Sequence, residues 1–297
     1  MAAGARAMSA RYPVGEIIFC RSFFAMIPLL IWLGFRGDLA SAIRTSNIRA
    51  HLKRGIIGSF GMFSGFQALA MLPLPDAVAL SYATPLIVVV LAAILLKEKV
   101  RLYRWSAVVL GFAGVLVMLS PHLGSFSSVR LPEAGALLAA GSSLGVAVAL
   151  VAAVFSALAT IEVRILTKHE NTGAIVFYFM ALTSLLGLLT IFFGWNMPSF
   201  NDTLWLIGIG IMGGLGQIFL TESYRHGDAS LIAPFEYTTM IYAVLLGWFM
   251  FGEWPVTAVF IGAGIVILSG IFVIWREHKL GLLRPEVHSA GPPQRMT

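Results

Sequence analysis

Of the 297 residues in this chain, 58% are hydrophobic and only 11% carry a charge, which is more apolar surface than a soluble core could bury. The composition therefore excludes a soluble globular protein and indicates a polytopic membrane protein. The single cysteine, Cys20, excludes an internal disulfide and a cysteine-based zinc site. The net charge of +6 would favour a nucleic-acid partner only if the basic residues shared one face.

Apolar runs recur along the chain, separated by short polar segments. A helix needs about 20 apolar residues to cross the roughly 30 Å hydrocarbon layer. Continuous rather than alternating apolar residues favour helices over a barrel. We predict an all-α membrane protein, a helical bundle whose nine spanning helices cover Pro13–Phe35, Gly55–Leu72, Asp76–Leu96, Arg104–Leu119, Leu144–Leu166, Gly173–Trp195, Thr203–Tyr224, Ala229–Phe251 and Pro255–Trp275.

The remaining segments are short or polar. Met1–Tyr12 has no apolar core long enough for a signal peptide. Glu133–Gly141 is apolar but short, so we expect an interfacial segment there. The polar tail Glu277–Thr297 contains Pro and Gly and is expected to be disordered.

The Lys and Arg residues alternate between loops, and this alternation predicts the orientation. Sixteen of the twenty lie in loops that would share one side of the membrane, and the loops of the other side contain only Arg130. Positive charge is retained on the cytoplasmic side, so we predict a cytoplasmic C-terminus. The basic balance thus reflects topology, and the nucleic-acid interpretation loses its support.

The two halves of the sequence resemble each other. Glu98 and Glu253 lie 155 residues apart, whereas the other matching residues lie 152 apart, which indicates a three-residue insertion in the second half. Five helices per copy is an odd number, so the second copy enters the membrane from the opposite side, which gives inverted repeats typical of secondary transporters. Four residues recur at a constant offset of 152: Gly58 as Gly210, Gly61 as Gly213, Asp76 as Asp228, and Ala77 as Ala229.

The repeat divides the chain into four predicted parts. Residues 1–120 form the first repeat, 121–143 an external connection, 144–275 the second repeat, and 276–297 a cytoplasmic tail. Only four full helices fit the first repeat, and Met1–Ser9 reads as a truncated first helix. Either the natural start lies upstream or the protein is a nine-helix variant. Arg6 and Arg11, at an otherwise uncapped external end, favour the first alternative.

Several motifs carry a resemblance to a known family. Arg21 in EIIFCRSFFA, Pro85 in SYATPLIVVVLAAILLKE, Pro234 in ASLIAPFEYTTMIYAVLLGWFMFGE, and Gly262 nine residues after Glu253 resemble the two-copy EamA pattern of the drug/metabolite transporter superfamily. The resemblance covers nearly the whole chain after Pro13. It implies ten helices, both termini in the cytoplasm, and alternating access around a central cavity.

Polar side chains inside the spans are the candidate substrate-binding residues, because charges in a membrane are costly and tend to face a cavity. At a rise of 1.5 Å per residue, the candidates of the first copy lie about 9 to 12 Å from one membrane edge, and those of the second copy lie about 9 to 10 Å from the opposite edge. Inverted symmetry would bring both groups to one solvated cavity. The six residues are Arg21, Gln67 and Tyr82 of the first copy and Gln217, Glu236 and Tyr237 of the second.

Each of these residues has a role and a structural alternative. Arg21 would meet an anionic or carbonyl group, or could snorkel to the headgroups or pair with Glu16. Glu236 would bind a cation or a proton, or could be a protonated acid bonded to another helix. The glutamines would hydrogen-bond to substrate and the tyrosines would stack on it, or both could join helices and pack.

Carboxylates near the ends of the spans are expected to be structural. Glu162 lies beside Arg164 in the sequence and Glu222 beside Arg225, where interfacial ion pairs are the default. Glu98 and Glu253 are expected to cap turns at the surface.

The inventory of motifs argues against an enzyme and predicts no cofactor and no metal site. HExxH, cysteine pairs and channel-filter sequences are missing from the chain, and the histidines fall in predicted loops or the tail. We expect a secondary transporter of a small organic metabolite in the bacterial inner membrane, with lipid and substrate as its partners, no nucleic acid, and a homodimer left open.

The substrate class stays open at this stage. A riboflavin-like vitamin is favoured by the aromatic and amide side chains, and amino acids, S-adenosylmethionine and drugs are the alternatives among carriers that this sequence resembles. A non-transporting membrane scaffold and a lipid flippase are the alternatives from other classes.

Overall fold

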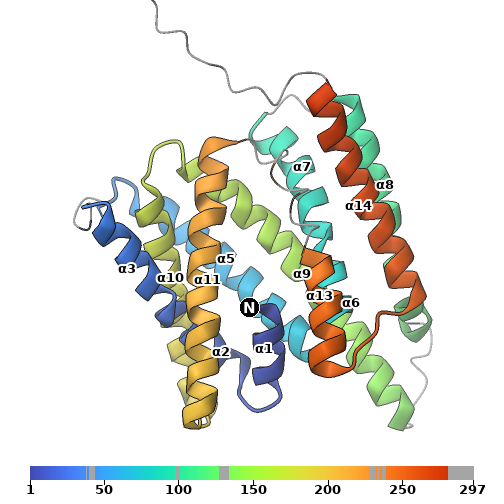
Figure 1. Ribbon diagram of the computed structural model, residues 1–297, viewed down its shortest axis with the longest axis horizontal. Helices are drawn as coiled ribbons and strands as arrows, with labels where there is room; N and C mark the ends of the chain where they lie inside the picture. Colours follow the sequence, from blue (N-terminus) through green and yellow to red (C-terminus); the bar gives the residue numbers. More distant parts are fainter. Residues whose placement is uncertain are drawn as a thin grey trace, which may run out of the picture.

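The computed structural model describes residues 1–37, 39, 44–97, 101–126, 134–227, 232, 235 and 239–279, and every regular element among them is a helix (Figure 1). The elements are α1 (Ala2–Ser9), α2 (Val14–Phe24), α3 (Met26–Phe35), α5 (Ile48–Met71), α6 (Leu74–Ser81), α7 (Ala83–Leu95), α8 (Leu102–Phe126), α9 (Ala134–Leu166), α10 (Thr172–Leu188), the 3-10 helix η1 (Leu189–Phe193), α11 (Phe200–His226), α13 (Thr239–Leu246), the π-helix η3 (Gly247–Phe251) and α14 (Thr257–Lys279).

Helices occupy each of the nine predicted spans, and the prediction of an all-α membrane bundle is confirmed. The separate interfacial segment expected at Glu133–Gly141 is not found. From Ala134 onward these residues form the beginning of α9, which is 33 residues long. Five segments are long and apolar enough to cross a membrane: Val14–Phe35, Leu74–Leu95, Ser143–Leu166, Thr172–Phe193 and Phe200–His226.

Two spans of the first half are broken in the same way. α2 and α3 meet at Ala25, and α6 and α7 meet at Tyr82. Each break comes three residues before a proline, Pro28 or Pro85. Proline lacks an N–H and its ring clashes with the carbonyl four residues earlier, so the helix bends there. The first bend follows directly after the last turn of α2, which carries Arg21.

Equivalent helices of the two halves run in opposite directions. In Figure 1, α5 and α8 descend from the upper edge, whereas α11 and α14 rise from the lower edge. α2 also packs on α10, and α8 on α14, so equivalent helices meet each other across the two halves. This is the arrangement of inverted repeats.

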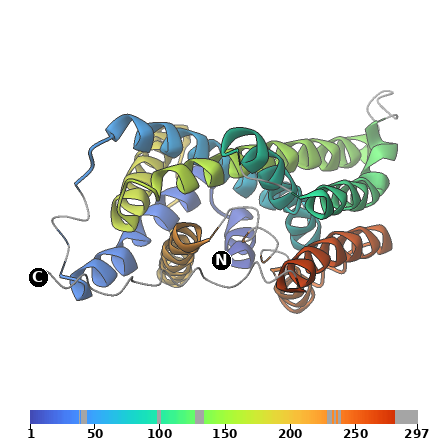
Figure 2. The same cartoon turned by 90° about the horizontal axis from the view of Figure 1, so that it is seen from above.

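The short helix α1 lies inside the bundle. Figures 1 and 2 both place it between α11 and α13, and it packs against α5 and α11. Ala3, Ala5 and Met8 of α1 are buried. The segment expected as a truncated first helix is therefore an eight-residue helix that contributes to the core.

Glycines set the closest approaches between helices. A Cβ on Gly187 of α10 would lie 2.9 Å from the backbone nitrogen of Phe19 in α2. A Cβ on Gly262 of α14 would lie 2.4 Å from the carbonyl oxygen of Gly114 in α8. Backbones this close leave no room for a side chain, as is common where membrane helices pack.

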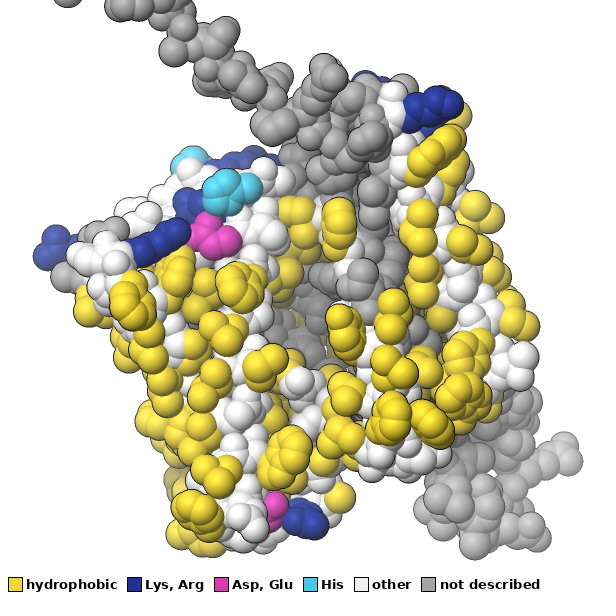
Figure 3. All heavy atoms as spheres, in the orientation of Figure 1, with side chains coloured by type: hydrophobic (Ala, Val, Ile, Leu, Met, Phe, Trp, Pro, Cys, Tyr) yellow, Lys and Arg dark blue, Asp and Glu magenta, His cyan; other side chains and the backbone are white. Residues whose placement is uncertain are grey.

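The outer surface suits a bilayer. Large apolar side chains cover much of the face of the molecule that Figure 3 shows. Leu116 of α8 and Phe219 of α11, for example, are 63% and 68% exposed. Lys, Arg and His side chains gather at the upper edge, where α3, α9, α11 and α14 end and α5 begins. We call this the basic edge and the other end of the bundle the opposite edge.

Candidate functional site

A cavity of about 300 Å³ lies where α2, α5, α9, α10 and α11 meet the α6–α7 junction, so both halves contribute to its wall. A second cavity of about 220 Å³ adjoins it on the side of α1 and α6. We call the two together the central cavity. Its wall combines apolar and aromatic side chains with a few polar groups, as is typical of a small-molecule site. The two cavities share Met62, Phe66, Ser81, Thr84 and Ser156.

Arg21 lines the central cavity, where the sequence places a substrate-binding residue. Arg21 is only 4% exposed. Nη1 lies 3.4 Å from the Met180 sulfur and Nη2 lies 3.5 Å from the Gly213 carbonyl oxygen, while Nε is buried without a hydrogen-bond partner. Glu16 does not pair with it, because the Glu16 carboxylate accepts a bond from the backbone nitrogen of Asn196.

Arg54 also lines the cavity, and sequence reasoning missed it by counting it among the loop cations. It sits six residues inside α5, is 4% exposed, and its guanidinium carbon lies 3.8 Å from the centre of the Phe179 ring. The Nε and Nη1 atoms are buried without a hydrogen-bond partner. The sequence did contain a signal for this position. Arg54, Gly58 and Gly61 are spaced four and three residues apart, so they share one face of a helix.

Three other predicted site residues differ in where they lie relative to the cavity. Gln217 lines the cavity from α11 and is 9% exposed. Tyr82 is buried at the α6–α7 break with its hydroxyl 3.2 Å from Thr239 Oγ1, next to the cavity wall but not part of it. Gln67 is exposed and does not line the cavity. It follows Phe66, which does line it, and a one-residue step turns the side chain by about 100° around the helix.

The last two predicted site residues, Glu236 and Tyr237, lie outside the described residues. The same is true of Pro234 and of Glu98.

Comparison with known proteins identifies the family. The profile of the EamA-like transporter family matches residues 1–120 and 143–276. The chain belongs to this family. Its relatives are transporters of the drug/metabolite type, so this EamA protein is a multi-pass membrane transporter of a small metabolite and not an enzyme.

Three relatives of this EamA protein carry different substrate names. It is 31% identical to an S-adenosylmethionine uptake transporter of Rickettsia prowazekii, over 89% of this chain and 84% of the relative. It is 30% identical to a riboflavin transporter of Vibrio cholerae, over 90% and 83%. It is also 30% identical to a pseudopaline exporter of Pseudomonas aeruginosa, over 91% and 89%.

A solved crystal structure shares the EamA fold. It superposes with a TM-score of 0.70 at 20% identity, covering 94% of this chain and 92% of the other. At this identity the likeness concerns the fold alone.

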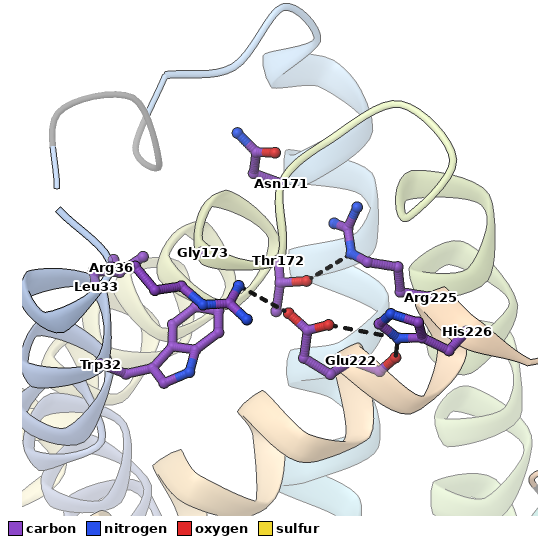
Figure 4. A pocket seen from close by; sticks show the side chains of 9 residues that line it. All are labelled: Trp32, Leu33, Arg36, Asn171, Thr172, Gly173, Glu222, Arg225 and His226. Carbon is purple, nitrogen blue, oxygen red and sulfur yellow. Dashed lines mark hydrogen bonds and ion pairs between the residues drawn. The ribbon is translucent and has the colours of Figure 1, made fainter. Parts of the chain in front are cut away.

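A smaller hollow of about 240 Å³ opens at the basic edge of the EamA bundle (Figure 4). Glu222 lies 3.6 Å from Arg36 Nη1 and 3.7 Å from His226 Nδ1, and Arg225 Nε donates to Thr172 Oγ1 at 2.9 Å. The expected pairing of Glu222 with Arg225 is thus wrong. The cations labelled in Figure 4 already have partners, so this hollow is a less suitable place for a charged substrate than the central cavity.

Glu162 likewise has a different partner from the expected one. Its carboxylate pairs with Lys53 Nζ at 2.6 Å, while Arg164 donates to the Tyr224 carbonyl oxygen. Lys53 and Glu162 belong to α5 and α9, so the ion pair joins the two halves at the basic edge.

The opposite edge is tied together by Glu253, which was expected only to cap a turn. Its Oε2 accepts from the Leu74 backbone nitrogen at 2.7 Å, at the start of α6, and its Oε1 lies 3.1 Å from Arg6 Nη2. Arg6 Nη1 donates in turn to the carbonyl oxygens of Leu69 and Ala70. Glu253 therefore connects the second half to the first.

Proposed function

We propose that the two halves rock about the central cavity and expose it alternately to the two sides of the membrane. The observation that supports this most directly is a polar cavity whose wall comes from both halves, beside helices broken at Ala25 and Tyr82. Broken helices next to a site at the repeat interface are a common feature of carriers with inverted repeats. The ties at Glu253 and Lys53 would open and close on opposite edges during this motion.

We assign substrate contacts to Arg21, Gln217 and the newly found Arg54, with Tyr82 supporting the wall. The body of the substrate would lie against Phe66 and Phe179, which favours a flat or partly apolar metabolite. A riboflavin-like heterocycle is the first compound to test, followed by S-adenosylmethionine, amino acids and drugs. Glu236 and Tyr237 stay in the proposal as a cation or proton site and a stacking residue.

The basic edge would face the cytoplasm of a bacterial inner membrane. Lys and Arg residues concentrate there, and such residues are retained on the cytoplasmic side. The C-terminus, which follows α14 from this edge, would then also be cytoplasmic.

The proposal is tested by ligand-dependent thermal stabilisation of the purified protein across a metabolite panel, followed by counterflow of each hit in liposomes. A transported compound should raise Tm saturably, and Arg21→Gln should lower its counterflow about 10-fold or more, as loss of a hydrogen bond to a charged group would. Arg36→Gln, in the hollow at the basic edge, is the matched control and should retain flux. Flux that is the same in Arg21→Gln as in the wild type would contradict the assigned site.

The role of Glu236 has a separate readout. If it carries a proton, flux should depend on pH and lose that dependence in Glu236→Gln. Flux that is independent of pH and unchanged in this variant would remove the proton-carrier role while leaving the carrier itself intact.

A further inference from the structure

We propose that Arg21 and Arg54 together form an anion-binding site in the central cavity, and that the substrate is an organic anion whose carboxylate or phosphate lies between the two guanidinium groups. This inference rests on the proposed transport function and adds a chemical class of substrate to it.

The first observation is that Arg21 lacks a partner of opposite charge. Its two closest acceptors are the thioether sulfur of Met180, a weak acceptor, and the Gly213 carbonyl oxygen at 3.5 Å, the far limit of a hydrogen bond. Its Nε has no acceptor at all among the described residues. The guanidinium keeps most of its hydrogen-bonding capacity for a ligand.

The second observation is that Arg54 is in the same situation on the neighbouring wall. Nε and Nη1 are buried and without an acceptor, and its clearest contact is with the face of the Phe179 ring. A guanidinium stays protonated in proteins, so it cannot avoid the cost of burial by losing its charge. Both arginines line the same cavity, where their positive charges repel each other.

The third observation is that the nearby carboxylates are engaged elsewhere. None of the described cavity-lining residues is an Asp or Glu. On the helices around the cavity, Glu16 accepts from Asn196, Glu162 pairs with Lys53, and Glu222 pairs with Arg36. Of these carboxylates, Glu162 acts electrostatically on Arg54 as well, so the described part of the chain balances the two cations only in part and leaves Arg21 without an opposite charge.

Glycines make room for both side chains. A Cβ on Gly58 would lie 2.2 Å from Arg54 Nη1, and a Cβ on Gly213 would lie 2.7 Å from Arg21 Nε. Gly58 and Gly213 come from equivalent helices of the two halves, α5 and α11. Each half thus supplies a helix face without side-chain bulk against which one guanidinium lies.

These observations indicate a ligand with negative charge. Burial of an unpaired cation is strongly unfavourable, and a bound anion with hydrogen-bond acceptors offsets that cost. The planar guanidinium of an arginine can donate to two oxygens of a carboxylate or phosphate at once, and two guanidinium groups can hold one such anion. Around them, Phe179 and Phe66 offer an apolar surface and Ser156, Thr160 and Gln217 offer hydrogen bonds to the rest of the molecule.

Matched compounds that differ only in an anionic group provide the test. We would measure thermal stabilisation of the full-length protein in nanodiscs by riboflavin and riboflavin 5′-phosphate, by N-acetylmethioninamide and N-acetylmethionine, and by inorganic phosphate. In at least one pair, the anionic member should stabilise saturably and bind about 10- to 100-fold more tightly than the neutral member, as expected for charge-assisted hydrogen bonds. Inorganic phosphate reports whether the anion alone is sufficient.

Variants then assign the effect to the two arginines. Arg21→Met and Arg54→Met should each remove the preference for the anionic member, and should raise the Tm of the ligand-free protein by about 2 °C or more because an unpaired buried charge is gone. Arg54→Lys, which keeps the charge, should keep part of the preference. Arg36→Gln, at the basic edge, should keep all of it.

Two results would overturn the anion site. One is equal stabilisation by charged and neutral members of every pair. The other is a preference that Arg36→Gln reduces as much as Arg54→Met does, since this would indicate a general surface effect.

Counterflow separates this inference from the transport proposal. If a neutral compound is exchanged at the same rate by wild type and Arg54→Met, the anion site is wrong and the carrier stands. If an anion binds saturably but is not exchanged, the site stands and the carrier proposal fails.

Discussion

At the scale of single residues, position in the helix matters more than residue type. Arg54 lies in the same charge-rich stretch as Lys53, but Lys53 reaches the ion pair with Glu162 at the basic edge while Arg54 is buried. Successive residues point about 100° apart around a helix, so neighbours in sequence can face opposite environments. The absence of a side chain at Gly58, one turn later on the same face, is what lets the guanidinium lie against α5.

Gly58→Ala tests this arrangement. The new Cβ would lie 2.2 Å from Arg54 Nη1 and 2.9 Å from the Phe179 ring, and the flexible guanidinium is the group best able to move. We expect the affinity for the anionic compound to fall about 10-fold while Tm changes by only a few degrees. Gly216→Ala in α11 is the control, because its Cβ would have no atom within 4 Å and Gly216 does not line the central cavity. Equal anion affinity in the two variants would contradict the role given to Gly58.

At the scale of elements, equivalent helices pair through glycines and bend at prolines. α8 and α14 touch backbone to backbone at Gly114 and Gly262, whereas Pro28 and Pro85 break the helices next to the cavity. Without water in the bilayer, van der Waals packing contributes strongly to helix association, so such close contacts are costly to lose. The α8–α14 pair is thus suited to stay rigid while the broken helices adjust.

Gly262→Ala should destabilise the protein, because its Cβ would lie 2.4 Å from the Gly114 carbonyl oxygen and 2.9 Å from the Met118 backbone nitrogen. Backbone atoms cannot move aside locally, and we expect a loss of about 2–4 kcal/mol. Gly264→Ala, two residues away with no atom within 4 Å, should be neutral or stabilising by up to about 1 kcal/mol. Chemical unfolding in detergent micelles compares the two, and equal stabilities would argue against the close contact.

At the scale of the whole molecule, polar ties join the two halves at both edges. Glu170, in the turn between α9 and α10, accepts hydrogen bonds from Thr45 and Ser46 of the first half and lies 3.6 Å from His51 Nε2. Burial of the Glu170 carboxyl opposes its ionisation, but these hydrogen bonds outweigh it, so its pKa lies below the ordinary value. Glu253 plays the corresponding role at the opposite edge.

The lowered pKa of Glu170 predicts a pH dependence of stability. The folded state favours the carboxylate, so the stabilisation is fully present above the ordinary glutamate pKa of about 4.3 and is lost as the pH falls through the folded-state value. Glu170→Gln should lower Tm at pH 7 by about 2–4 °C. The difference from wild type should shrink as the pH falls below about 4. Melting curves between neutral and acidic pH test this, and a Tm difference that stays constant would show that ionised Glu170 is not the cause.

What the sequence by itself determined was the class of protein, the spans, the duplicated plan, the family and the position of Arg21 at a cavity. These depend on composition and on motifs along the chain, which need no knowledge of neighbours. The tertiary structure alone decided that Arg54 faces the cavity and Gln67 faces away, and that Glu162, Glu222 and Glu253 bind partners far away in the chain. The reason is that the tilt, rotation and bending of each helix are set by the helices packed against it, and a stretch of apolar residues does not encode them.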